Sequence, residues 1–382
     1  MNEDYAILFI TLNGENKIIQ RTRYLKCELA IPNSMQVLRL LPLNRAHKQS
    51  LKLTRDIEMK IRRPYVKILK IMRNREEEVN IKKFKRELIK LGKAISKNLL
   101  KAIISGFDID LDSERNMAIA LDSDTAKIPW ELGFISETHF RLCDKFDVGR
   151  LRIVEDYSWH RTNETRRSAH ALVVGINYKN SPINTEELEY AEDEAAKVEE
   201  ILTENGLKVI SLLGKKATRD RILKELRRGV KIFHFTGHGN MAKEVSSIFA
   251  YDGELTTIDF INSLEETPAP SLSFMNACET STEFSTVIKQ ANSEWESYNW
   301  AFAMANAGGR AFIGTFWPIS DSKETQLFSY RFYREFLDKD NSIAKSLRKA
   351  RELTNKKDET IGYAYVLYGP PTLMKKDLTP LA

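Results

Sequence analysis

The second half of this sequence alternates between short apolar runs and longer amphipathic segments. The runs have the length and apolar content of buried strands, and the segments between them have helical spacing. We expect strands at 171–176, 208–213, 232–236, 272–276 and 311–315, and helices at 187–204, 218–228, 300–307, 325–336 and 343–353. Alternation of this kind is typical of a mostly parallel sheet with helices on both faces. The predicted fold class is therefore α/β.

Two of the predicted strands stop just before a reactive residue. The run 231–236 leads into Gly237-His238-Gly239, and the run 272–276 leads into Ala277-Cys278. In an open α/β sheet, sites collect at the carboxyl ends of the strands. A thiol and an imidazole in these positions can face each other, which is the arrangement that a cysteine nucleophile and its base require.

The chemistry of such a pair assigns a role to each group. Cysteine attacks as the thiolate, and a nearby histidine raises the thiolate fraction and can protonate the leaving amine. The backbone N–H of Gly239 can stabilise a developing oxyanion, with the N–H of Cys278 as a second donor. The alternative is that Cys278 is a core residue, because cysteine is among the most buried residue types. His234, inside the predicted strand, is interpreted as a core histidine or as one that supports the catalytic residues.

The first half of the sequence is less regular. We expect a strand at 4–11, a turn at Asn13-Gly14 and one or two return strands within 17–29, because Asn-Gly is a strong hairpin signal. A helical segment is expected from 35 to 104, a strand at 116–121, and a short capped element at 128–132. The polar segment 157–170 predicts an internal boundary, which gives an N-terminal half of residues 1–157 and a second half of residues 168–382.

Composition narrows the class of protein. The chain has 382 residues, of which 42% are hydrophobic, and no apolar run of about 18 residues that could span a membrane. The N-terminus lacks the pattern of a secretion signal, and the cysteines Cys27, Cys143 and Cys278 cannot all pair, so we expect a cytoplasmic protein. Neither a nucleotide-binding motif nor metal-ligand spacing is present, so no cofactor and no metal are expected.

Much of the net charge of +6 lies between Arg45 and Lys101, where Lys and Arg are dense. One interpretation is a surface for nucleic acid or an acidic partner. The other is the solvated face of amphipathic helices, and the sequence favours it because aromatic interleaving and recognised nucleic-acid motifs are lacking. We therefore expect neither direct nucleic-acid binding nor a membrane partner.

Several segments, in order, resemble one protein family. They are Ile128-Pro129-Trp130-Glu131-Leu132, the strand 171–178, the helix with Leu188, Ala191, Glu194 and Ala195, then His238-Gly239, Asn276-Ala277-Cys278-Glu279-Thr280, and the segments 314–321 and 365–370. The sequence resembles the CHAT family of caspase-like peptidases, in the clan that also holds caspases, metacaspases, gingipains and separase. The resemblance covers about residues 95 to 375.

The resemblance implies a caspase-like fold whose N-terminal half is a degenerate relative of the catalytic half. It also implies that His238 is the general base and acid, that Cys278 is the nucleophile, and that peptide bonds are hydrolysed through a thioester. Metacaspases place an acid two residues before the cysteine, and this acid selects Lys or Arg. Here that position is Asn276, a predicted substrate-binding residue, so the resemblance does not imply strict specificity for a basic side chain. Glu194 and Trp317 are the other predicted substrate-binding residues, with a helix-surface carboxylate and plain core packing as the respective alternatives.

The predicted function is that of a cysteine endopeptidase that cleaves a specific protein partner. The resemblance suggests a role in bacterial defence or regulated cell death, with a separate regulatory or sensor protein because the sequence carries no repeats. The alternative function is a catalytically silent caspase-like scaffold that recruits a partner.

Overall fold

The computed structural model divides the chain into two compact units. It describes residues 6–13, 23–30, 47–53, 55–73, 81–101, 116–121, 128–135, 140–152, 170–242, 245–264, 267, 269–277, 300–355 and 361–378. Unit 1 comprises residues 1–154 with 370–372, and unit 2 comprises 155–369 with 373–382. Most of the polar segment 157–170, the predicted boundary, lies outside the described residues.

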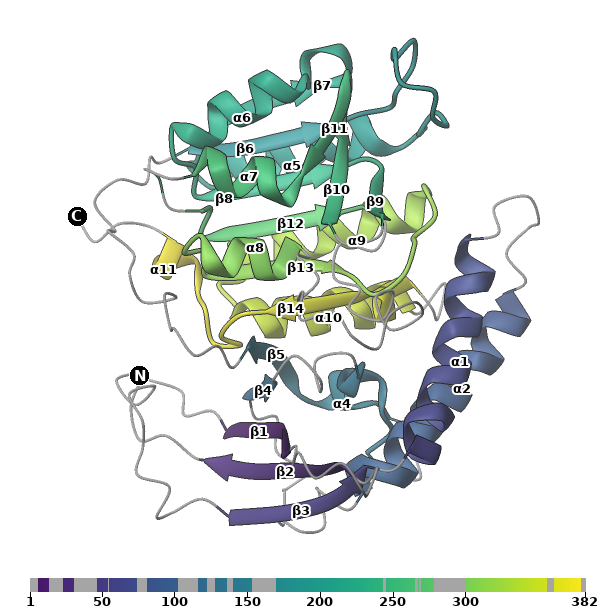
Figure 1. Ribbon diagram of the computed structural model, residues 1–382. Coiled ribbons are helices and arrows are strands. Elements are labelled where there is room, and N and C mark those ends of the chain that lie inside the picture. Colours follow the sequence, from purple (N-terminus) through teal and green to yellow (C-terminus); the bar gives the residue numbers. More distant parts are fainter. Residues whose placement is uncertain are drawn as a thin grey trace. The chain divides into compact units, whose positions relative to one another are not determined.

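Unit 1 combines a mixed sheet with a pair of long helices. Its strands are β1 (Ala6–Asn13), β2 (Arg23–Ala30), β3 (His47–Leu53), β4 (Asn116–Leu121) and β5 (Asp147–Arg152). Its helices are α1 (Arg55–Arg73), α2 (Ile81–Ile95) continued by η3 (Ser96–Leu100), and the short η4 (Trp130–Leu132) and α4 (Leu142–Lys145). The strand order is β3-β2-β1-β4-β5, with β1, β4 and β5 parallel and β2 and β3 antiparallel to their neighbours. Helices α1 and α2 lie side by side (Figure 1).

The expectation of a helical segment from 35 to 104 is wrong for residues 47–53, which form β3. In this strand, Leu51 and Leu53 alternate with polar neighbours, which is the period of a strand and not of a helix. Each residue of β3 also has a partner in β2; Leu51, for example, lies opposite Leu25. The pairing with β2 is a long-range interaction, so a helical reading of local spacing misses it.

A buried ion pair holds η4 to β5. The Arg150 guanidinium donates to Glu131 through Nε (2.6 Å) and Nη2 (2.7 Å), and Nη2 also donates to the carbonyl of Ile128 (2.9 Å). Arg150 is 1% exposed and Glu131 is 2% exposed. Because both charges are out of water, each one depends on the other for its solvation.

Unit 2 is built around a mostly parallel sheet. Its strands are β6 (His170–Gly175), β7 (Lys208–Leu213), β8 (Ile232–Thr236), β12 (Leu272–Asn276), β13 (Ala311–Thr315) and β14 (Tyr365–Tyr368). They lie in the order β14-β13-β12-β8-β6-β7, and only β14 runs antiparallel to its neighbour in this unit. This arrangement confirms the predicted α/β fold with a mostly parallel sheet flanked by helices.

Helices cover both faces of this sheet. The helices of unit 2 are α5 (Ala191–Glu204), η7 (Gly214–Lys216), α6 (Arg219–Arg227), α7 (Thr257–Ser263), α8 (Trp300–Asn306), α9 (Lys323–Tyr333) with η9 (Arg334–Asp338), α10 (Ile343–Asn355), η10 (Ile361–Ala364) and α11 (Lys375–Leu378). Helix α9 contacts both α5 and α10 in one layer, and α7 contacts both α6 and α8 in the other (Figure 1). Every residue of β8, β12 and β13 is buried, which explains why apolar residues predominate in their sequences.

A small antiparallel sheet follows β8 directly. It consists of β9 (Gly239–Ala242), β10 (Val245–Ala250) and β11 (Gly253–Thr256), in the order β11-β10-β9. Gly239 lies opposite Ile248 in this sheet. The sheet therefore fixes the backbone on the carboxyl side of His238.

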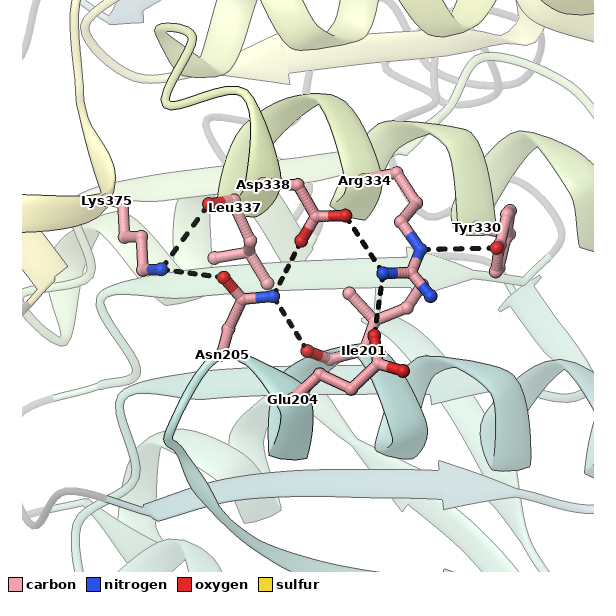
Figure 2. A network of polar contacts seen from close by, with 8 residues as sticks. All are labelled: Ile201, Glu204, Asn205, Tyr330, Arg334, Leu337, Asp338 and Lys375. Atoms are coloured by element: carbon pink, nitrogen blue, oxygen red, sulfur yellow. Dashed lines mark hydrogen bonds and ion pairs between the residues drawn. The ribbon is translucent and has the colours of Figure 1, made fainter.

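A network of polar contacts joins the ends of α5, η9 and α11 (Figure 2). Asn205 donates to Asp338 (2.8 Å) and accepts from Lys375 (2.7 Å), while Arg334 donates to both Glu204 (2.7 Å) and Asp338 (2.9 Å). The hydrogen bond from Asn205 and the charge of Arg334 hold the pKa of Asp338 below its ordinary value. The network thus holds the ends of α5, η9 and α11 together.

Among the residues that the structure describes, no helix combines the length and the apolar character that a bilayer crossing requires.

Candidate active site

The ends of β8 and β12 lie side by side at the carboxyl edge of the unit 2 sheet. The two strands are parallel, and Thr236 lies opposite Asn276. The ladder continues one residue further, because the N–H of Gly237 donates to the carbonyl of Asn276 (3.3 Å). His238 follows Thr236 by two positions, as Cys278 follows Asn276. Cys278 itself lies outside the described residues, so its predicted role as the nucleophile stays a prediction.

The imidazole of His238 is held in one tautomer by a backbone carbonyl. Its Nε2 lies 2.8 Å from the carbonyl oxygen of Glu186, and the residue is 5% exposed. A carbonyl can only accept a hydrogen bond, so Nε2 carries the proton. In the neutral ring, Nδ1 is then the basic nitrogen. This orientation makes Nδ1 the nitrogen that the predicted role of a general base uses.

Tyr178 fixes the backbone and the ring of His238. Its hydroxyl accepts from the N–H of His238 (2.9 Å) and donates to the carbonyl of Phe249 (2.6 Å). The tyrosine and histidine rings lie 4.7 Å apart, centroid to centroid. Between them, Gly237 has no room for a side chain, because a Cβ there would lie 2.7 Å from the Tyr178 hydroxyl. This close approach requires a glycine before His238.

If His238 is the predicted general base, Tyr178→Phe should lower kcat for peptide cleavage by about ten- to a hundredfold and leave KM nearly unchanged, because a small displacement of a catalytic group has effects of this size. The substitution keeps the ring but leaves the buried N–H of His238 without its acceptor. Steady-state kinetics on a cleavable peptide measure both constants. Tyr330→Phe, at a half-buried position of α9 where the hydroxyl accepts from Arg334, is the matched control; an equal loss in both variants would contradict a positioning role for Tyr178.

The segment that supplies the Glu186 carbonyl is tied down at several points. The N–H of Tyr190 donates to Asp321 (3.1 Å), and the N–H of Leu188 donates to the carbonyl of Asn177 (2.9 Å). Tyr178 and Asn180 have positive φ values of 60° and 56°, so the chain turns sharply after β6. These contacts fix the orienting carbonyl although it belongs to a loop.

The residues just before Cys278 are held by side chains from three other elements. Asn276 donates to Glu194 on α5 (2.7 Å) and accepts from the Tyr365 hydroxyl on β14 (2.6 Å). The Thr315 hydroxyl on β13 donates to the carbonyl of Ala277 (2.8 Å). Asn276 is 4% exposed. The backbone that leads to the predicted nucleophile is thus positioned from both sides.

Glu194 belongs to a buried polar cluster beneath this edge of the sheet. Its Oε1 lies 3.3 Å from Nε2 of His234, a distance typical of an ion pair, although the direction is not that of a hydrogen bond. The Tyr333 hydroxyl lies 3.4 Å from Nδ1 of His234. Burial raises the pKa of Tyr333 well above its ordinary value, as does the charge of Glu194, so this hydroxyl stays protonated. His234 is fully buried, as predicted for a core histidine.

The remaining predicted site residues lie at the same edge of the sheet or just beyond it. Gly239 begins β9, directly after His238, and its backbone N–H remains the predicted oxyanion donor. Trp317 follows β13, is 1% exposed and stacks on Phe316 with centroids 6.1 Å apart. A hydrogen bond joins Asn276 to Glu194, so each of these side chains already has a partner within the protein. Their assignment to substrate binding, with that of Trp317, stays a prediction. No cluster of potential metal ligands occurs among the described residues.

The sequence did not point to the residues that orient the predicted site residues. The Glu186 contact uses a backbone carbonyl, which leaves no signal in a side-chain pattern. Tyr178 and Tyr365 lie within segments that carry the family resemblance, but their hydroxyl bonds depend on long-range packing. Thr315 ends a predicted strand. A polar residue at the end of a buried strand is the one sequence signal that could have pointed to an orienting residue.

Comparison with known proteins identifies a family and a fold. The CHAT domain family matches residues 89–366. No curated protein sequence matches the chain. Among solved structures, separase in the Saccharomyces cerevisiae separase–securin complex is similar with a TM-score of 0.56 and 12% identity. The match covers 95% of this chain but 30% of the separase chain, so this chain spans less than a third of that relative.

Two other structures are similar at lower scores. The Arg-specific cysteine proteinase gingipain R (RgpB of Porphyromonas gingivalis) has a TM-score of 0.46 and 13% identity, with 84% of this chain and 76% of that chain covered. The Drosophila initiator caspase Dronc has a TM-score of 0.37 and 12% identity, with 55% and 84% covered. At 12% identity, the likeness to separase is one of fold.

Proposed function

Because the chain belongs to the CHAT domain family and has a caspase-like fold, we propose that it is a cysteine endopeptidase that cleaves a specific protein partner. The observation that carries this proposal is the contact between Nε2 of His238 and the Glu186 carbonyl at 2.8 Å. It assigns the proton to Nε2 and makes Nδ1 the proton acceptor, at the end of the strand beside the one that leads to Cys278. Proton transfer through Nδ1 requires this orientation of the ring.

The proposed reaction begins with proton transfer from the Cys278 thiol to Nδ1 of His238. The thiolate attacks the carbonyl carbon of the scissile peptide bond, and the backbone N–H groups of Gly239 and Cys278 stabilise the oxyanion. His238 then gives its proton to the leaving amine, the C–N bond breaks and a thioester forms. Water, deprotonated by His238, attacks the thioester, and the carboxyl product leaves while the thiol is restored.

The cellular setting is part of the proposal and is supported by the family resemblance. We place the enzyme in the cytoplasm, in a bacterial defence or cell-death response, under the control of a separate regulatory protein. Its substrate is a protein, and the buried Glu194 and Asn276 support a role for both residues in shaping the site next to Cys278.

We expect wild-type protein, and not the Cys278→Ala variant, to create new N-termini in a bacterial lysate. Labelling of N-termini followed by mass spectrometry maps each cut. Cys143→Ser, a change at a buried cysteine in unit 1, is the control and should retain the wild-type cuts. Identical N-termini with wild type and Cys278→Ala would exclude proteolysis by this site and favour a silent scaffold that recruits a partner.

A further inference from the structure

The helices α1 and α2 of unit 1 carry an excess of positive charge that the rest of the chain does not share. Residues 55–73 and 81–101 contain 15 Lys and Arg and 3 Asp and Glu. With the connecting residues 74–80, which add one Arg and three Glu, the segment 55–101 has a net charge of +10, whereas the whole chain has +6. The remainder of the chain is therefore acidic, and the positive potential is concentrated on one helical pair.

The exposed cations form stripes along the helix axes. On α2 and η3 they recur at steps of four and three residues, which places them on one face. They are Lys82, Arg86, Lys90, Lys93, Lys97 and Lys101, all exposed. On α1 the stripe consists of Lys60, Arg63, Lys67 and Lys70, again all exposed. At 1.5 Å per residue, the longer stripe extends over about 28 Å.

The two stripes meet at a single buried carboxylate. Glu87 is 2% exposed and lies 2.9 Å from Lys90, 3.6 Å from Arg86 and 4.0 Å from Lys67 of the other helix. Burial by itself would raise the pKa of Glu87, but the hydrogen bond from Lys90 and the nearby cations lower it below its ordinary value. Glu87 thus stays charged and brings both stripes onto one basic face, which we define as the ten residues named above.

The apolar sides of these helices are already covered. Phe84, Leu88 and Leu91 of α2 and Tyr65 and Ile68 of α1 are at most 3% exposed. A helix that lies on a membrane inserts its apolar side between the lipids, and here that side is buried within unit 1. What remains outside is a long row of cations with two exposed isoleucines, Ile81 and Ile89, beside it.

This geometry fits a rod-like polyanion. Each strand of a duplex places one phosphate every 3.4 Å along the axis, so the longer stripe spans about eight base pairs. Aromatic residues that could stack on bases are buried in the described parts of both helices, so contacts to the phosphate backbone are the ones available. We propose that the basic face of α1 and α2 binds the phosphate backbone of a nucleic-acid duplex, without sequence preference. This inference goes beyond proteolysis and replaces the interpretation of a merely solvated face.

The test measures binding of the full chain to a fluorescent duplex of about 20 base pairs and random sequence, as DNA and as RNA, by anisotropy over a range of salt concentrations. The quadruple variant Lys82→Gln, Lys93→Gln, Lys97→Gln, Lys101→Gln leaves the cations around Glu87 in place. We expect its affinity at 0.1 M salt to fall more than about tenfold, and the slope of log K against log salt to decrease by about three to four, at 0.9 per lost phosphate contact.

A matched variant removes the same charge elsewhere: Lys208→Gln, Lys215→Gln, Lys216→Gln, Lys224→Gln, all exposed positions of unit 2. It should bind the duplex within about twofold of wild type if the basic face is the site. Equal weakening by both sets, or binding that does not depend on salt, would overturn the proposal. Binding to anionic lipid vesicles would also overturn the proposal, if the first variant abolishes this binding and an excess of duplex does not compete with it. Circular dichroism melts of both variants check that they are folded.

Discussion

Replacing His238 with glutamine is expected to lower kcat for peptide cleavage by about 10²- to 10⁴-fold, the range typical of a lost general acid and base. Glutamine has a similar reach and its amide can still donate to the Glu186 carbonyl, which now accepts from Nε2 of the imidazole at 2.8 Å. The fold should therefore survive, whereas the proton acceptor at the Nδ1 position is lost. Kinetics on a peptide that spans a mapped cut site measure the effect.

The control for this substitution is His170→Gln. His170 begins β6, at the amino end of the strand and therefore at the sheet edge opposite His238. Its replacement should leave kcat within about twofold of wild type, since exchanges remote from the site have small effects. A His238→Gln protein that retained a third of the wild-type kcat, with an unchanged melting curve, would show that His238 does not transfer the proton.

Arg150→Ala is expected to destabilise unit 1 by about 3–5 kcal/mol, the cost typical of removing one partner from a buried ion pair. The substitution leaves the Glu131 carboxylate, 2% exposed, without the two hydrogen bonds at 2.6 and 2.7 Å that now solvate it. Hydrogen exchange of peptides from 128–135 and 140–152 reports the free energy of local opening in this unit, which a single melting temperature for a two-unit chain does not.

Two further variants separate a buried pair from a surface one. Lys60→Ala removes a cation from an exposed pair with Asp56 and should cost about 0.5 kcal/mol or less. The double variant Glu131→Gln, Arg150→Met removes both charges and should recover much of the loss, because the penalty comes from an isolated charge. If Arg150→Ala were no more destabilising than Lys60→Ala, the pair would contribute little to the stability of unit 1.

The strands of the unit 2 core could be predicted from the sequence because burial on both faces leaves a simple pattern. The strands β8, β12 and β13 begin and end at the predicted residues, since each is rich in buried apolar residues and is preceded by a polar residue. The small sheet β9–β11 could not be predicted in this way. Its strands contain polar residues and glycine, and they depend on pairing with one another after the turn at His238.

The candidate site could be predicted only in part, for a related reason. His238 could be predicted because an imidazole just after a buried strand is chemically distinctive. The groups that orient it are a carbonyl of Glu186 and the hydroxyl of Tyr178, and both reach it from a loop whose path depends on contacts to Asp321 and to Tyr251. A sequence pattern carries no record of such contacts between distant segments.

The pairing of His238 with Cys278 is tested most directly by the rate at which iodoacetamide alkylates Cys278 as a function of pH. Mass spectrometry of the Cys278 peptide separates this reaction from those of Cys27 and Cys143. Proton transfer to His238 predicts a wild-type inflection well below about 8.5, the ordinary thiol pKa, and a shift to about 8.5 or higher in His238→Gln. Superimposable profiles for the two proteins would contradict it.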